Sequence, residues 1–199
     1  SAIGRRLPFY QRDIALVVLT RASDEKLAGL VTLLERYTVA QVIEPSAARS
    51  GTTAARWREL KGANAIATQT ATDGLQAQLG DGVTLEVIRA GGEDEGLTLR
   101  LTHGALSIWF GGDGDVSLLL QQIPEASLSP VSVFRLGRHG DAKSVSEPLL
   151  SALAPSIAII SVGADNRGGD PDAKTLESLQ SIGARVYRTD LHGTVEIIS

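Results

Sequence analysis

The sequence contains no cysteine and no methionine, and only three of its 199 residues are histidine. Without cysteine, the chain can form no disulfide and no thiolate zinc site, and it has no cysteine nucleophile. A catalytic zinc centre usually takes three or more ligands from histidine, cysteine and carboxylates, so the scarcity of histidine lowers the expectation of a metal-dependent hydrolase. Because position 1 is not methionine, we expect Ser1 to begin a segment of a longer protein.

Long hydrophobic runs are also missing. No apolar stretch approaches the roughly 20 residues that span a bilayer, and no signal peptide opens the chain, so we expect a soluble segment that does not itself insert into a membrane. The net charge of −4 argues against tight non-specific DNA binding by the whole surface. Charge is uneven, however: residues 1–61 carry +4 and residues 62–130 carry −7, which leaves a local basic patch open.

Buried strands alternate with helices at both ends of the chain. Apolar β-branched runs predict strands over 13–20 and 39–44, and helical spacing predicts a helix from about Asp24 to Tyr37, capped by Ser23 or Asp24. A second helix is predicted over 53–61. In the last third the pattern predicts four strands and two helices, namely strands over 131–136, 157–162, 185–188 and 194–198 and helices over 144–153 and 172–182.

The middle of the chain has a different pattern. Period-two alternation over 83–87 and 97–101, followed by a turn at 102–105 and a strand over 106–110, predicts antiparallel sheet. A helix is predicted over 116–122. No repeat or linker separates these segments, so we expect one α/β domain over residues 1–199.

Four loops follow predicted strands, after Thr20, Phe110, Leu136 and Val162, at the strand ends where layered α/β folds build their sites. Glycine-rich loops can also simply turn the chain. His139 is the one histidine on such a loop, and it could face either a pocket or solvent. No Walker sequence or Gly-x-Ser-x-Gly elbow is present, so phosphate-loop and serine-hydrolase chemistry are not indicated.

The segments Ile159–Arg167 and Gly183–Asp190, with Gly193 after them, resemble the C-terminal domain of the ComEC competence proteins, which has a metallo-β-lactamase fold. Leu79–Val87 is similar to a strand in the middle of that domain. The resemblance spans nearly the whole chain and implies a four-layer αβ/βα sandwich whose opening N-terminal strands are missing. It also implies a parent protein of the bacterial cytoplasmic membrane that imports single-stranded DNA, with this domain suspected of degrading the other strand.

The resemblance places several metal-ligand positions of the family on residues that cannot serve as ligands. The family's Leu-Thr-His-x-Asp-x-Asp-His-x-Gly-Gly corresponds to residues 19–29, with Arg21, Ser23, Glu25 and Lys26 at the ligand positions. Arg21 and Lys26 would repel a divalent metal ion where histidine would bind it. In the later loops the family's ligands correspond to a retained Asp113, a retained His139 and, in place of histidine, Asp170.

We therefore expect a non-catalytic domain of a ComEC-type DNA-uptake protein, without a resident metal and with a binding or structural role. The alternative is a metal-dependent nuclease or phosphodiesterase that holds zinc or manganese on Glu25, Asp113, His139 and Asp170. Such a two-metal site needs many ligands.

Charge and missing strands suggest further contacts. We expect Arg21 to pair with Asp113 or Glu25 where the metals would sit, because the planar guanidinium can bond a carboxylate bidentately. The candidate phosphate contacts for weak DNA binding are Arg135, Arg138 and Arg167. The remaining expected partners are the rest of the parent protein and a second copy of this chain, paired through the exposed edge.

Overall fold

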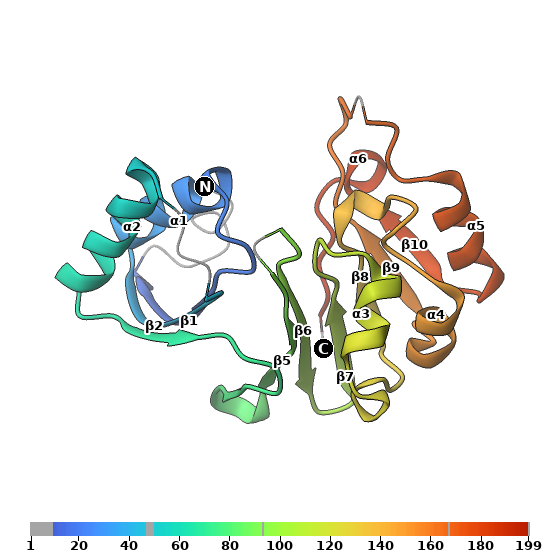
Figure 1. The fold of residues 1–199 in the computed structure, drawn as a ribbon, viewed down its shortest axis with the longest axis horizontal. Coiled ribbons are helices and arrows are strands. Elements are labelled where there is room, and N and C mark those ends of the chain that lie inside the picture. The colour runs from blue at the N-terminus through green and yellow to red at the C-terminus, as the bar shows by residue number, and fades with distance from the viewer. Residues whose placement is uncertain (1–9, 47–49, 93, 167, 199) are drawn as a thin grey trace. The chain divides into compact units, whose positions relative to one another are not determined.

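The computed structural model describes residues 10–46, 50–92, 94–166 and 168–198 (Figure 1). They form two compact units, Ser1–Ala71 and Thr72–Ser199, each with its own sheet and helices. The mixed α/β class is confirmed. The prediction of one domain over residues 1–199 stays a prediction, as does the stacking of the two units into four layers.

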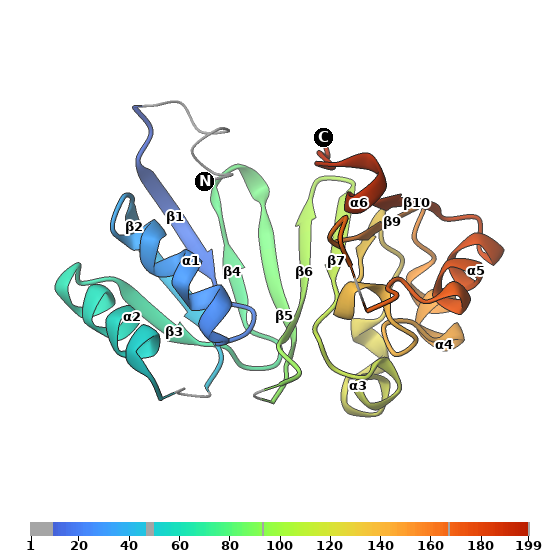
Figure 2. The same cartoon turned by 90° about the horizontal axis from the view of Figure 1, so that it is seen from above.

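The first unit is a parallel sheet covered by two helices. Its strands β1 (Asp13–Val18), β2 (Thr38–Glu44) and β3 (Ala67–Thr70) lie in that order. Helices α1 (Asp24–Leu34) and α2 (Thr52–Ala63) connect them, and because both crossovers advance the same way along the sheet, both helices lie on one face (Figure 2). The core between sheet and helices is apolar, with Val17, Leu27, Val42, Ala54, Trp57 and Leu60 among its members.

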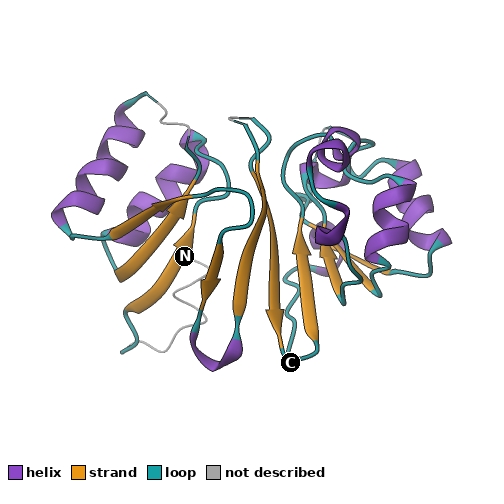
Figure 3. Ribbon diagram, turned by 60° about the horizontal axis from the view of Figure 1, so that its bottom comes forward, coloured by secondary structure: helices purple, strands orange, loops and turns teal. Residues whose placement is uncertain are grey.

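The second unit contains a mixed sheet, drawn in orange in Figure 3. Its seven strands lie in the order β10-β9-β8-β7-β6-β5-β4. Its first strands form antiparallel hairpins and its later ones are parallel. The strands are β4 (Gln76–Gln78), β5 (Thr84–Ala90), β6 (Leu97–His103), β7 (Leu106–Phe110), β8 (Val133–Arg135), β9 (Ile157–Ile160) and β10 (Arg185–Arg188).

Helices connect the parallel strands of this sheet. They are α3 (Val116–Gln122), α4 (Glu147–Leu153) and α5 (Ala173–Ser181), and a short α6 (Thr189–His192) follows β10. Because β7 to β10 follow one another across the sheet, α3, α4 and α5 cover the same face. The main core of this unit lies between them and the sheet, and its fully buried side chains include Trp109, Phe134, Leu149, Leu153, Ile160 and Leu179.

Some predicted elements need correction. Residues 194–198 are not a strand, because Thr189–His192 turn into α6 and the chain after Gly193 pairs with no strand of the described sheet. Strands β3 and β4 were not predicted, because their residues are almost all polar or exposed and only backbone pairing makes them strands. The described part of the chain has no helix long and apolar enough to cross a membrane.

Candidate functional site

Three loops of the second unit pack backbone against backbone at the ends of its parallel strands. They are residues 111–115 after β7, 137–141 after β8 and 161–172 after β9. A Cβ on Gly137 would lie 1.7 Å from the Gly112 carbonyl oxygen, and one on Gly140 would lie 2.9 Å from Cβ of Pro171. Glycine is therefore required where these loops touch.

Arg138 ties two of these loops together. Its Nη1 donates to the Asp113 carbonyl oxygen at 2.7 Å, and its Nε donates to Oδ2 of Asp141 at 2.7 Å. Its backbone N–H lies 3.3 Å from Oδ1 of Asp113, to which it donates. The Arg138 guanidinium therefore holds the loop that carries Asp113. Hydrogen bonds from a charged donor such as this one are stronger than those between neutral groups.

His139 lies in a strained backbone conformation next to Arg138. The φ angles of Arg138, His139 and Gly140 are 49°, 57° and 80°, all in the left-handed region. Side-chain-bearing residues adopt this region at a cost, so the loop is held by the contacts around it. Nδ1 of the exposed His139 ring lies 2.8 Å from the Ser161 carbonyl oxygen. A carbonyl only accepts, so Nδ1 carries the proton in this contact, and in the neutral ring Nε2 keeps its lone pair.

Asp113 and Arg135 interact by charge at the end of β8. Burial lowers the pKa of Arg135, and the negative charge of Asp113 raises it. Backbone hydrogen bonds anchor the loop that carries Asp113. The Asp113 N–H donates to the Glu95 carbonyl oxygen at 2.5 Å, and the Gly111 N–H donates to the Arg135 carbonyl oxygen at 2.8 Å. These backbone bonds fix the position of Asp113, and Arg138 on the neighbouring loop and Arg135 on β8 lie beside it.

The loop after β9 carries Asp170 and Arg167. The half-buried Asp170 accepts from the Asn166 side-chain amide through its carbonyl oxygen at 2.5 Å. Asn166 in turn accepts from the Gly168 N–H at 3.0 Å. Arg167 lies outside the described residues, so its predicted contact with phosphate stays a prediction.

The predicted ligand positions near α1 belong to the first unit. Of the two predicted caps of α1, Ser23 and Asp24, the N-cap is Ser23. Its Oγ accepts from the Lys26 N–H at 3.4 Å. Arg21 is half-buried and the Lys26 side chain is exposed. The side chain of Glu25 lies outside the described part. The expected pairing of Arg21 with Asp113 or Glu25 stays a prediction.

Among the residues that the structure describes, no three His, Cys, Asp or Glu side chains lie close enough together to hold one metal ion. Two-metal hydrolase sites need several such ligands clamped around both ions. In the second unit, Arg138 instead bonds to Asp141 and to the backbone of Asp113.

Several groups that shape this site were not predicted from the sequence. Asp141 is the carboxylate partner of Arg138, and its carbonyl oxygen accepts from Thr175 at 3.0 Å and Ser144 at 2.6 Å. No motif marks Asp141, but a carboxylate three residues after an arginine on a site loop is a pattern that could have indicated the pair.

Comparison with known proteins gives sequence and fold relatives. No family model matches the chain. ComE operon protein 3 of Bacillus subtilis is 42% identical over 64 residues, which are 32% of this chain and 8% of that protein. Recombination protein 2 of Haemophilus influenzae is 26% identical over 199 residues, covering 96% of this chain and 23% of that protein. The chain thus spans less than a quarter of either curated relative.

Solved structures share the fold at low sequence identity. The metallo-β-lactamase fold protein YhfI of Bacillus subtilis has a TM-score of 0.56 and 10% identity, covering 88% of this chain and 75% of that one. Zn²⁺-bound PqqB of Methylobacterium extorquens has a TM-score of 0.54 and 13% identity, covering 88% of this chain and 69% of that one. The predicted metallo-β-lactamase-like fold is therefore confirmed, and so is the resemblance to ComEC-type competence proteins.

Proposed function

From a metallo-β-lactamase fold and sequence similarity to ComEC-type competence proteins, we propose that this chain is a non-catalytic domain of a DNA-uptake protein. Its role is to bind or to support the rest of a parent protein of the bacterial cytoplasmic membrane. The observation that carries the proposal is the Arg138 clamp, in which a guanidinium bonds Asp141 and the Asp113 carbonyl oxygen within the loops that hold metal ligands in the family.

The charge of the site supports this proposal. A divalent metal ion compensates the carboxylates of a hydrolase site, and carboxylates left without compensation are costly to bury. Here two side chains bring positive charge to Asp113: the Arg138 guanidinium bonds its carbonyl oxygen, and Arg135 interacts with its carboxylate by charge. A metal ion would have to bind beside these cations, which repel it. We therefore expect the loops to keep their geometry without an ion.

One observation favours the alternative, a metal-dependent nuclease or phosphodiesterase. Histidines that bind metals usually donate their other ring N–H to a carbonyl or carboxylate, and His139 donates Nδ1–H to the Ser161 carbonyl oxygen. Nε2 of His139 could therefore bind zinc or manganese together with Asp113, Glu25 and Asp170. The cations at Arg21, Lys26 and Arg138 oppose this reading.

Metal retention and DNA cleavage separate the two functions. The purified chain is incubated with excess zinc or manganese, desalted and analysed for metal content, and is assayed on single- and double-stranded DNA. We expect substoichiometric metal and no divalent-dependent cleavage above background. Stoichiometric metal with cleavage that EDTA and His139→Ala both abolish, but that the control His192→Ala keeps, would establish the nuclease instead.

Contact with DNA, if the domain makes one, is proposed to be weak and sensitive to salt. Arg138 already donates to Asp141 and Asp113, and Asp113 offsets the charge of Arg135, so few cations of these loops remain for phosphate. Each phosphate contact that is made releases counterions, which gives the steep salt dependence. Fluorescence anisotropy with labelled single-stranded DNA at two salt concentrations measures it, and tight binding that is indifferent to salt would contradict it.

Self-association through a sheet edge is the remaining proposed contact. Within the described part of the first unit, β1 pairs with β2 on one side only. Strand edges with free N–H and C=O groups promote pairing with another chain. We expect a concentration-dependent dimer by light scattering, and a strictly monomeric species at high concentration would contradict it.

A further inference from the structure

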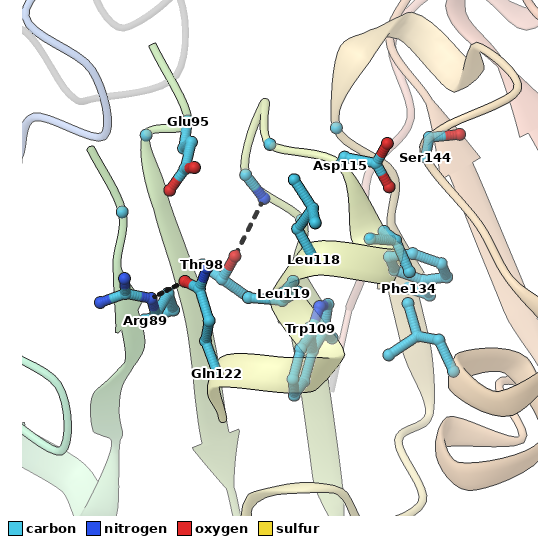
Figure 4. A pocket seen from close by; sticks show the side chains of 18 residues that line it. Arg89, Glu95, Thr98, Trp109, Asp115, Leu118, Leu119, Gln122, Phe134 and Ser144 are labelled. Carbon is cyan, nitrogen blue, oxygen red and sulfur yellow. Dashed lines mark hydrogen bonds between the residues drawn. The ribbon is translucent and has the colours of Figure 1, made fainter. Parts of the chain in front are cut away.

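Two pockets, one in each unit, differ in the space that they hold. The pocket between α3 and the sheet of the second unit, whose lining includes Trp109 and Phe134, has a cavity volume of about 20 Å³ (Figure 4). That is room for about one water molecule. The pocket of the first unit has a cavity volume of about 130 Å³. A cavity of roughly 150 Å³ holds one benzene molecule, so of these two pockets only that of the first unit can take a ring-sized ligand.

The pocket of the first unit lies where the parallel strands of that unit end. In its lining, Leu19 follows β1, Pro45 follows β2, and Thr70 is the last residue of β3. Leu27 of α1 and Trp57 of α2 add apolar walls from the helices that cover the sheet. Layered α/β folds usually bind their ligands beyond the carboxyl ends of parallel strands. The position of this pocket is therefore that of a ligand site.

The pocket of the first unit does not use the positions that correspond to the family's metal ligands. Of the described residues in that loop, Arg21, Ser23 and Lys26 are not part of its lining. Their neighbours Ala22 and Leu27 are. The chemistry of the pocket is therefore decided by other side chains, namely those at the end of β2 and on α2.

Glu44 places a carboxylate in this pocket whose charge is already compensated. Its side chain is 22% exposed, and its Oε1 accepts from Nζ of Lys61, a side chain that is 10% exposed. Its Oε2 accepts from the Trp57 Nε1–H at 2.8 Å. Each carboxylate oxygen has a second lone pair, so Glu44 can accept one more hydrogen bond from the pocket side. A neutral hydroxyl suits this position better than an ammonium, because Lys61 already supplies the positive charge.

Arg58 brings a second positive charge to the pocket, from the exposed side of α2. Its Nε donates to the Ala54 carbonyl oxygen at 3.3 Å, and its two terminal nitrogens bond no other group of the described chain. Arg56 on the same helix is different, because it bonds Glu35 at 3.1 Å and Glu59 at 3.0 Å. Since Glu44 is compensated within the pocket, the Arg58 guanidinium leaves a net positive charge there. That charge favours a ligand with an anionic group.

We propose that the pocket of the first unit binds a small aromatic hydroxy acid, with the ring in the cavity, the hydroxyl donating to Glu44 and the carboxylate bonded to the Arg58 guanidinium. The ring packs against Leu19, Leu27 and the Trp57 indole. The planar guanidinium fork matches a carboxylate, which can accept from both terminal nitrogens. The site belongs entirely to the first unit and uses neither DNA nor metal, so it stands or fails separately from the proposed function.

The two tryptophans give a direct test, because Trp57 lines the pocket and Trp109 lies in the other unit. The probe 4-hydroxybenzoate is titrated into the full chain labelled with ¹⁵N, and the two indole N–H resonances are followed. Either Trp57→Phe or Trp109→Phe assigns both resonances. We expect a saturable shift of the Trp57 resonance and none of the Trp109 resonance. A Trp57 resonance that stays fixed, or that drifts together with the other without saturating, would overturn the proposal.

Calorimetry on matched variants and probes separates the carboxylate contact from the hydroxyl contact. Arg58→Gln should weaken 4-hydroxybenzoate binding about fivefold, the upper end for an exposed ion pair. Arg56→Gln removes the same charge from the same helix and should leave binding unchanged. The uncharged 4-hydroxybenzamide should not distinguish Arg58→Gln from the wild type. Benzoate, which lacks the hydroxyl, should bind the wild type about fivefold more weakly, the worth of about one hydrogen bond. Equal affinity of 4-hydroxybenzoate for the wild type, Arg58→Gln and Arg56→Gln would refute the site, as would equal affinity of the two acids.

Discussion

Removing the Arg138 side chain tests whether its guanidinium stabilises the loops 111–115 and 137–141. Its Nε bonds Asp141 and its Nη1 bonds the Asp113 carbonyl oxygen, both at 2.7 Å. The side chains of Arg138 and Asp141 are 33% and 26% exposed, so the pair is screened only in part. Hydrogen bonds to charged groups contribute about 1.5–3 kcal/mol when well desolvated, and exposed pairs contribute about 0.2–1 kcal/mol. We therefore expect a coupling energy of about 1–2 kcal/mol between Arg138 and Asp141.

A double-mutant cycle isolates that coupling. Arg138→Ala, Asp141→Asn and the double variant are unfolded by urea in a Trp57→Phe background, so that only the buried Trp109 reports and only the second unit is followed. Arg138→Lys should lose most of the coupling, because one ammonium cannot span two acceptors that the guanidinium fork reaches together. Single-variant costs that simply add, within about 0.3–0.5 kcal/mol, would refute the clamp.

Three further perturbations have defined outcomes. Glu44→Gln should destabilise the first unit by about 2–3 kcal/mol, because the Lys61 side chain, 10% exposed, loses its carboxylate partner. Gly137→Ala should cost about 3 kcal/mol or more, since its Cβ would overlap a carbonyl oxygen 1.7 Å away. The hydrogen bond from Arg188 lowers the pKa of Asp190 below 3.8. The pair therefore stabilises the fold above pH 3.8, and this contribution disappears as the pH falls through the folded pKa. Arg188→Gln should return the Asp190 pKa, followed by NMR, toward 3.8.

The first two of these perturbations have matched controls. For the buried pair, the double variant Glu44→Gln/Lys61→Met should recover much of the loss, because it removes the unpaired ammonium while the glutamine amide oxygen can still accept from the Trp57 Nε1–H. For the loop contact, Gly163→Ala meets no atom within 4 Å and should change stability by less than about 0.5 kcal/mol. Urea unfolding in which Gly137→Ala and Gly163→Ala behave alike would show that the loops do not pack as described.

The sequence predicts the elements whose side chains decide their structure. The run Ile157–Ile160 is apolar along its whole length and forms β9, with Ala158 and Ile160 buried. Ser23 has the side chain of an N-cap and begins α1. Strand β3 is the opposite case: its four residues are all exposed, and it is a strand only because β2 offers a parallel edge. Residues 194–198 alternate as a strand would, but they pair with no described strand and form none.

The site shows a similar division. Alignment with a motif locates loops correctly, since Asp113, His139 and Asp170 all lie on loops after parallel strands of the second unit. It does not say what a substituted residue will contact. Arg138 bonds Asp141, a pairing that was not predicted, and its proposed contact with phosphate stays a prediction. The three-residue spacing permits this pair, and the left-handed turn at residues 138–140 brings its two side chains together.

The backbone strain at Arg138 and His139 shows that contacts around the loop 137–141 hold it in place. Arg138 and His139 both occupy left-handed backbone conformations, each costing about 1–3 kcal/mol unless the surroundings impose it. In a metal centre the ion's bonds to its ligands can meet that cost. In this chain the bonds at hand are those of Arg138 to Asp113 and Asp141 and of His139 to the Ser161 carbonyl oxygen. One guanidinium and one imidazole therefore hold the left-handed turn at residues 138–140.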